Sequence, residues 1–146
     1  MDRDAAPAES SGGRLSACAL RRVGQILGGF AGVRAVYLFG SYADGTARPD
    51  SDIDLAIVPA DDQVRDQVLA MLAALARAGY ERVDLVFLDG TDAVLRFQAV
   101  SRNQPLYVAA DFSHPQYFVR ALNEYWDLEP LLQVQHAAYK KRVLRG

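Results

Sequence analysis

The chain has 146 residues, of which 51% are hydrophobic and 23% charged, the balance of one globular domain rather than of a disordered or fibrous chain. A formal net charge of −2 at pH 7 gives no basic field, so neither long nucleic acids nor membranes are expected as partners. No stretch has the ~20 consecutive apolar residues of a membrane span and no signal peptide opens the chain, which favours a cytoplasmic protein.

The first elements come after a tail over 1–13 that we expect to be disordered. Apolar residues recur at helical spacing from Leu15 to Leu27, and the pattern stops at Gly28. A β-branched and aromatic run, Val33–Phe39, then ends abruptly at a Gly-Ser pair, as a buried strand does at a tight turn. No linker or repeat interrupts the rest of the chain, so 14–146 is expected to be a single domain with a C-terminal helical region.

A strand, a helix and a third strand are predicted next. After a loop of turn-forming residues, Asp52–Val58 has the pattern of a second strand. Asp61 or Asp62 can cap a helix that runs to about Ala78 and stops at a glycine. The third strand covers 82–88.

The last third of the chain is predicted to be mostly helical. Thr91 or Asp92 caps a helix that fades before a short extended piece over 106–108. Ser113 opens a long C-terminal helical region. Pro130 should kink or break that region, because proline removes a backbone donor and clashes with the preceding turn.

The most informative motif joins the first two strands. Gly40 and Ser41 are followed, ten residues later, by Asp52-Ile-Asp54. Because side chains alternate along a strand, both carboxylates point to the same face. Two close carboxylates repel unless a cation neutralises them, and oxygen ligands favour Mg²⁺, with Mn²⁺ as a substitute. The pattern therefore predicts a metal site that also holds substrate phosphates.

A third carboxylate and a phosphate cradle complete this prediction. Gly40 lets the backbone approach a phosphate, to which Ser41 can donate hydrogen bonds. Between Arg82 and Leu88, Asp84 is the only charged side chain on its face of the third strand, and it can join Asp52 and Asp54 if that strand lies beside the second. Asp52 and Asp54 would then hold the metal, while Asp84 binds a second metal or accepts the proton of the attacking hydroxyl. The expected reaction is in-line nucleotidyl transfer with pyrophosphate leaving.

With these motifs, the chain from about Val33 to Tyr139 resembles the polymerase-beta-like nucleotidyltransferases, and among them the minimal nucleotidyltransferase antitoxins that pair with HEPN-domain ribonuclease toxins. The resemblance implies an α/β (α+β) fold with a small mixed sheet flanked by helices. It also implies two Mg²⁺ ions and ATP as substrate. For the antitoxins it implies transfer of AMP to a tyrosine of the partner toxin, within a hetero-oligomer.

One departure from the family affects the phosphate site. Many relatives have an arginine just before the loop glycine, where this chain has Asp44. Arg48 or another basic residue is then expected to compensate, and Arg102 is a second candidate, although solvated arginines are the commoner outcome. His114 is expected at a helix start rather than as a general base.

Three functions stay open for this chain. The first is a protein adenylyltransferase antitoxin, because the chain lacks the length and positive charge that a polymerase needs. The second is a binding antitoxin that blocks its toxin by contact, and the third is a small-molecule nucleotidyltransferase. The aromatic C-terminal region can pack on the sheet or form a partner surface. Its large side chains are Phe112, Tyr117, Phe118, Tyr125, Trp126, Leu128, Leu131, Leu132 and Tyr139.

Overall fold

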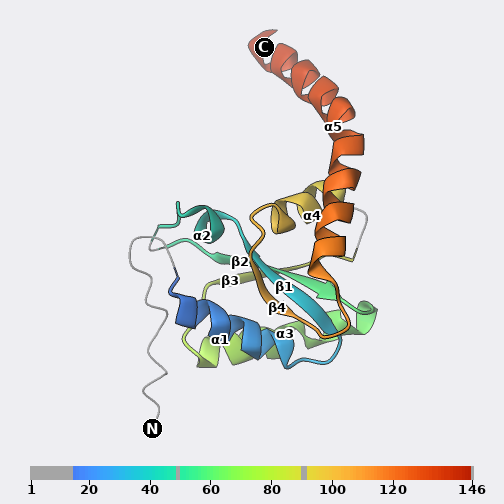
Figure 1. The fold of residues 1–146 in the computed structure, drawn as a ribbon. Helices are drawn as coiled ribbons and strands as arrows, with labels where there is room; N and C mark the ends of the chain where they lie inside the picture. The colour runs from blue at the N-terminus through green and yellow to red at the C-terminus, as the bar shows by residue number, and fades with distance from the viewer. Residues whose placement is uncertain (1–14, 49, 90–91, 146) are drawn as a thin grey trace.

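A computed structural model describes residues 15–48, 50–89 and 92–145, with side chains described as far as Pro130 (Figure 1). The predicted tail over 1–13 lies outside these residues. The elements in chain order are α1 (Ala17–Gly28), β1 (Val33–Phe39), α2 (Ser41–Asp44), β2 (Ile53–Pro59), the 3-10 helix η2 (Asp62–Gln67), α3 (Val68–Arg77), β3 (Val83–Phe87), α4 (Ala93–Val100), β4 (Pro105–Val108) and α5 (His114–Arg145).

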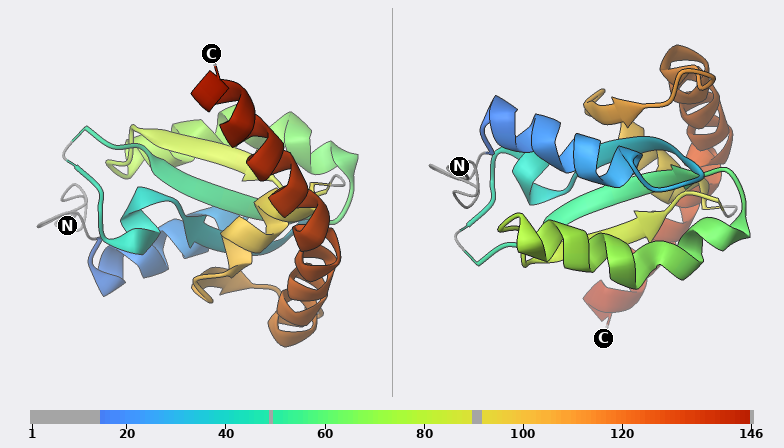
Figure 2. Two further views of the ribbon diagram at one scale, coloured as in Figure 1. Left: turned by 90° about the horizontal axis from the view of Figure 1, so that it is seen from above. Right: turned by 90° about the horizontal axis from the view of Figure 1, so that it is seen from below.

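The four strands form one mixed sheet in the order β3-β2-β1-β4. β1 pairs antiparallel with β2 and with β4, whereas β2 pairs parallel with β3. Helices α1 and α3 cover the lower face of the sheet in Figure 1, and α4 and α5 lie on the upper face; Figure 2 shows the same two layers from above and below. The predicted fold class, a small mixed sheet flanked by helices, is confirmed.

Alternation along the strands divides the core between the two faces. The lower core lies under α1 and α3, and its strand members include Val36, Leu38, Leu55 and Ile57. The upper core lies under α4 and α5, and its members are Ala35, Tyr37, Ala56, Val58, Leu88, Ala99, Val100 and Ala121. Burial on both faces fixes the register of β1 and β2, because a slip of one residue would exchange the two faces.

Most element boundaries lie within a residue or two of their predicted positions. β1 spans the predicted residues, and β2 begins one residue later than predicted, so Asp52 directly precedes it. The caps at Asp61 and Asp92 are both present, accepting from the N–H groups of Gln63 and Leu95. The single helix predicted from Asp61 or Asp62 to Ala78 is wrong, because its first six residues form the 3-10 helix η2.

The C-terminal helical region is one helix, α5, that continues past Pro130. Of the predicted kink or break at Pro130, the break is absent, and Figure 1 shows that α5 curves and extends beyond the rest of the fold. A proline kinks a helix without ending it when the neighbouring turns keep their hydrogen bonds. Across the described parts of the chain, no helix is long and apolar enough to cross a bilayer.

Candidate active site

One edge of the sheet brings the predicted carboxylates together. In the register, Phe39 of β1 lies opposite Asp54 of β2, and Asp54 lies beside Asp84 of the parallel strand β3. Phe39, Asp54 and Asp84 point to the upper face of the sheet, as does Ala56, two residues after Asp54 in β2. The expectation that the third strand would lie beside the second is confirmed, and it places two of the three carboxylates in one row.

Asp54 is the least exposed of the three carboxylates. Asp52 and Asp84 are exposed, whereas Asp54 is half-buried. Burial raises the pKa of Asp54 above its ordinary value, and the negative charges of Asp84 and then Asp52 raise it further. A cation bound beside Asp54 would offset this repulsion.

Gly40 is the residue that lies closest to Asp54 from the loop side. Its φ of 74° and ψ of −156° belong to a region that essentially only glycine occupies. A Cβ built on Gly40 would lie 2.1 Å from Asp54 Oδ2, which leaves no room for a side chain. Glycine is therefore required here both for the backbone conformation and for the close approach of the turn to the carboxylate.

Gly40 leads directly into the short helix α2, which the sequence did not predict. The N–H groups of Ala43 and Asp44 both donate to the Gly40 carbonyl oxygen, at 3.1 and 3.0 Å. Gly45, in the left-handed conformation, ends the helix. Ser41 is thus the first residue of a helical turn that begins beside Asp54, and its N–H group has no partner within the helix.

The donor set at this edge suits Mg²⁺. Its ligands are carboxylate oxygens, which a hard divalent cation prefers, and the missing Cβ of Gly40 lets the Asp54 carboxylate lie directly against the turn. As placed, the carboxylates do not form a closed cluster: within residues 15–48, 50–89 and 92–145, no three His, Cys, Asp or Glu side chains are close enough to hold one metal ion.

The basic residues near the turn differ in what they contact. Arg48 is exposed in the loop before β2, where its N–H donates to Ser51 Oγ at 2.7 Å. Arg102 forms an ion pair with Asp44, with 2.6 Å between Nη2 and Oδ1. Asp44, the residue that departs from the family pattern, is therefore neutralised by a cation from the turn after α4. No sequence signal predicts this pair, because its members lie on distant elements.

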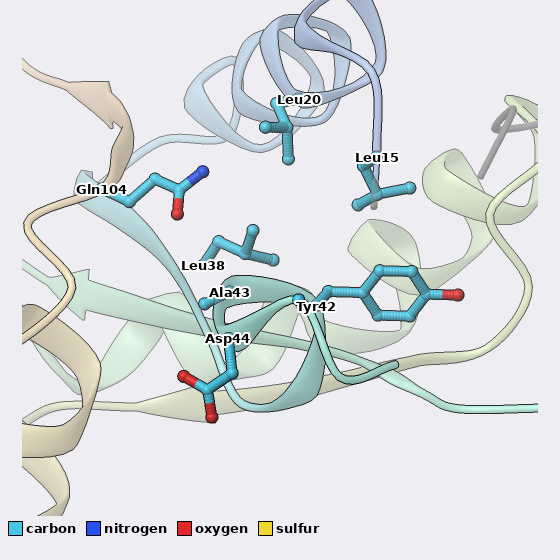
Figure 3. Close-up of a pocket in the computed structure, with 8 residues that line it drawn as sticks. Leu15, Leu20, Leu38, Tyr42, Ala43, Asp44 and Gln104 are labelled. Atoms are coloured by element: carbon cyan, nitrogen blue, oxygen red, sulfur yellow. The ribbon is translucent and has the colours of Figure 1, made fainter. Parts of the chain in front are cut away.

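A pocket of about 220 Å³ lies between α1 and α2 (Figure 3), and Asp52, Asp54 and Asp84 are not among its lining residues. Leu38, which lines it, belongs to the lower core, and so the pocket opens on the opposite face of the sheet from Asp54. Its volume is below the roughly 300 Å³ of small-molecule sites. The lining residues are Leu15, Leu20, Leu38, Tyr42, Ala43, Asp44, Gly45 and Gln104.

Known proteins are similar to this chain in sequence and in fold. The protein adenylyltransferase MntA of Shewanella oneidensis is 40% identical over 77 residues, 51% of this chain and 54% of that protein. The chain thus spans about half the length of the curated relative it matches.

Two of the similar solved structures cover most of this chain. One is a toxin–antitoxin complex with AMP-PNP, with 28% identity and a TM-score of 0.60 over 86% of this chain and 98% of that chain. The other is a tri-AMPylated Shewanella oneidensis HEPN toxin in complex with MNT antitoxin, with 26% identity and a TM-score of 0.55 over 86% of this chain and 95% of that chain. Residues 22–111, more than half of the chain, match the family described as Polymerase beta, Nucleotidyltransferase, and the protein belongs to that family.

Proposed function

We propose that this chain is a Mg²⁺-dependent nucleotidyltransferase that moves AMP from ATP to a tyrosine hydroxyl of a HEPN-type toxin and thereby neutralises it. The observation that carries the proposal is that Asp54, beside Asp84 in the sheet, lies against the Gly40 turn, where a Cβ on Gly40 would be 2.1 Å from Asp54 Oδ2. The relatives support the acceptor: one is named a protein adenylyltransferase, and a structural neighbour contains an AMPylated toxin. An exposed free cysteine, Cys18, is compatible with a reducing cytoplasm.

The turn at Gly40 and Ser41 is the proposed binding site for the nucleotide phosphates. Ser41 and Tyr42 supply the first two N–H groups of α2, which face outward by helix geometry, and the Ser41 hydroxyl adds a third donor. Arg48 is exposed on the same loop and adds positive charge. The AMP-PNP in a structural neighbour supports ATP as the substrate.

The proposed roles of the three carboxylates are to bind the metal ions and to accept a proton. Asp52 and Asp54 would hold Mg²⁺, and Asp84 would hold a second ion or accept the tyrosine proton. When bound, Mg²⁺ or Mn²⁺ offsets the negative charge that develops on the phosphate oxygens. The tyrosine oxygen forms a bond to the α-phosphorus, the bond to pyrophosphate breaks, and the hydroxyl proton leaves toward the carboxylate row.

The long helix α5 supports a protein as the acceptor. Some of its aromatic side chains pack within the domain: Tyr117 and Phe118 contact the upper core, and Tyr125 stacks on Phe97 with ring centroids 4.0 Å apart. Val119 and Trp126, however, are 54% and 56% exposed. Exposed large apolar side chains are typical of interface anchors. The predicted partner residues Leu131, Leu132 and Tyr139 lie outside the side chains that the structure describes.

The same exposed face favours a second candidate, an antitoxin that blocks its toxin by contact alone. Co-expression with the toxin in growing cells separates the two. Because transfer needs the carboxylates and contact does not, Asp52→Asn/Asp54→Asn should abolish neutralisation. Asp62→Asn/Asp66→Asn, the same charge change on exposed residues of η2, should neutralise fully. Full neutralisation by the first variant would reject transfer as the mechanism.

A further inference from the structure

The helix α2 is too short to hold its own position. It has four residues, and its hydrogen bonds are those of one turn, including the donation from the Thr46 N–H to the Ser41 carbonyl oxygen at 2.9 Å. A single turn is unstable in isolation because nucleation costs more than one hydrogen bond returns. Its place beside Asp54 therefore depends on contacts with other elements.

The ion pair of Asp44 with Arg102 is such a contact. Asp44 is the last residue of α2, and its carboxylate lies 2.6 Å from the guanidinium of Arg102, on the turn between α4 and β4. The side chains are 37% and 55% exposed, so the pair is accessible to substitution without loss of core packing. It joins the end of α2 to a part of the chain that is distant in sequence.

The turn that carries Arg102 is itself anchored to the centre of the sheet. Asn103 has a left-handed φ of 51°, and its side-chain oxygen lies 2.6 Å from His114 Nε2. His114 Nδ1 lies 2.8 Å from the hydroxyl of Tyr37, which is fully buried in β1. With the amide oxygen as acceptor, Nε2 donates, and Nδ1 accepts the proton of the Tyr37 hydroxyl. These contacts fix the turn that carries Arg102 relative to β1, the strand that ends directly before Gly40.

We propose that Arg102 is a positioning residue of the nucleotide site: through Asp44 it holds α2, and so keeps the Gly40 and Ser41 turn in place against Asp54. The inference rests on the proposed function for its consequence, namely that the turn binds the nucleotide phosphates. Because Gly40 and Asp54 are already in close contact, a small displacement of α2 alters the phosphate site directly. Loss of the pair should therefore weaken nucleotide binding more than it slows transfer.

Amide hydrogen exchange tests the positioning step without any need for activity. The reporters are the N–H groups of Ala43, Asp44 and Thr46, which donate within the turn. Arg102→Ala should speed their exchange roughly two- to fivefold, the range expected for loss of an exposed ion pair, and leave the β1 amides unchanged. The control is Arg77→Ala, an exposed arginine at the end of α3. Equal exchange in wild type and Arg102→Ala would overturn the proposal.

A double-mutant cycle tests the consequence for the nucleotide. Binding of AMP-PNP with Mg²⁺ should weaken about threefold or more when Arg102→Ala is made in wild type, and should not change when it is made in the Asp44→Ala background, where the pair is already absent. Equal weakening by Arg102→Ala in both backgrounds would reject positioning and make Arg102 a direct phosphate contact. If wild type transfers no AMP, the proposed function fails, while the exchange measurement still decides the role of Arg102.

Discussion

Substituting Gly40 with alanine perturbs the backbone and the carboxylate site at once. At φ 74° and ψ −156°, a non-glycine residue costs about 1–3 kcal/mol, and the reduced freedom of the unfolded chain returns about 0.4–1 kcal/mol. The new Cβ would also lie 2.1 Å from Asp54 Oδ2, so the carboxylate must swing away. We expect a net loss of stability of about 1–2 kcal/mol, or a fall in Tm of about 2–8 °C.

The loss of activity in Gly40→Ala should be far larger than the loss of stability. A displacement of about 1 Å of a catalytic group can cost on the order of a hundredfold in rate. Thermal unfolding and AMP transfer are measured side by side, with Gly29→Ala as the control. There φ is −77° and the Cβ would lie 3.5 Å from its nearest atom, so stability and activity should hold. If Gly40→Ala is as stable and active as wild type, the account of this turn is wrong.

Three further outcomes are expected from the charges and ligands of the site. Because the pKa of Asp54 is raised above 3.8 by burial and by its acidic neighbours, the native state binds that proton more tightly, and stability falls as the pH rises above 3.8. Asp54→Asn should lack this fall, so in thermal unfolding scans between about pH 4 and pH 7 its Tm should rise relative to that of wild type. A difference in Tm that does not change with pH would contradict the raised pKa of Asp54. Burial lowers the pKa of His114, so wild type should lose stability as the pH falls below 6.5, and His114→Gln should lose that dependence. Finally, Mg²⁺ and AMP-PNP at a hundred times Kd should stabilise wild type by roughly 2.7 kcal/mol in thermal scans. EDTA should reverse the shift, and Asp52→Asn/Asp54→Asn should show none; a shift that survives both changes would exclude the carboxylates as the metal site.

The parts of the fold that the sequence predicted are those with local signals. Val33–Phe39 is a continuous apolar run followed by Gly-Ser, and it forms β1 as predicted. The position of Asp84 also came from pattern: a charged residue within an otherwise apolar strand indicated a role beside the Asp52 and Asp54 carboxylates, and the parallel pairing of β2 with β3 sets Asp84 beside Asp54. Alternation and turn chemistry are short-range properties that a sequence displays directly.

The features that the sequence did not predict depend on contacts between distant residues. The hydrogen bond between Tyr37 and His114 joins residues 77 positions apart, and the sequence around each residue contains no pattern that predicts the contact. His114 was predicted only as the start of a helix, which is correct but omits its role in holding Asn103. The helix α2 was missed because its four residues are too few to show a helical period. The ion pair of Asp44 and Arg102 was missed for the same reason as the histidine contact.

AMP transfer to a partner protein, dependent on Asp52 and Asp54, can be measured with ATP labelled at the α-phosphate. The protein is purified with its toxin and incubated with label and Mg²⁺, and wild type is compared with Asp52→Asn/Asp54→Asn. Wild type should place label on a toxin tyrosine, and the variant should place none. An unlabelled toxin that stays bound and inhibited would contradict AMP transfer and show that the protein acts by contact alone.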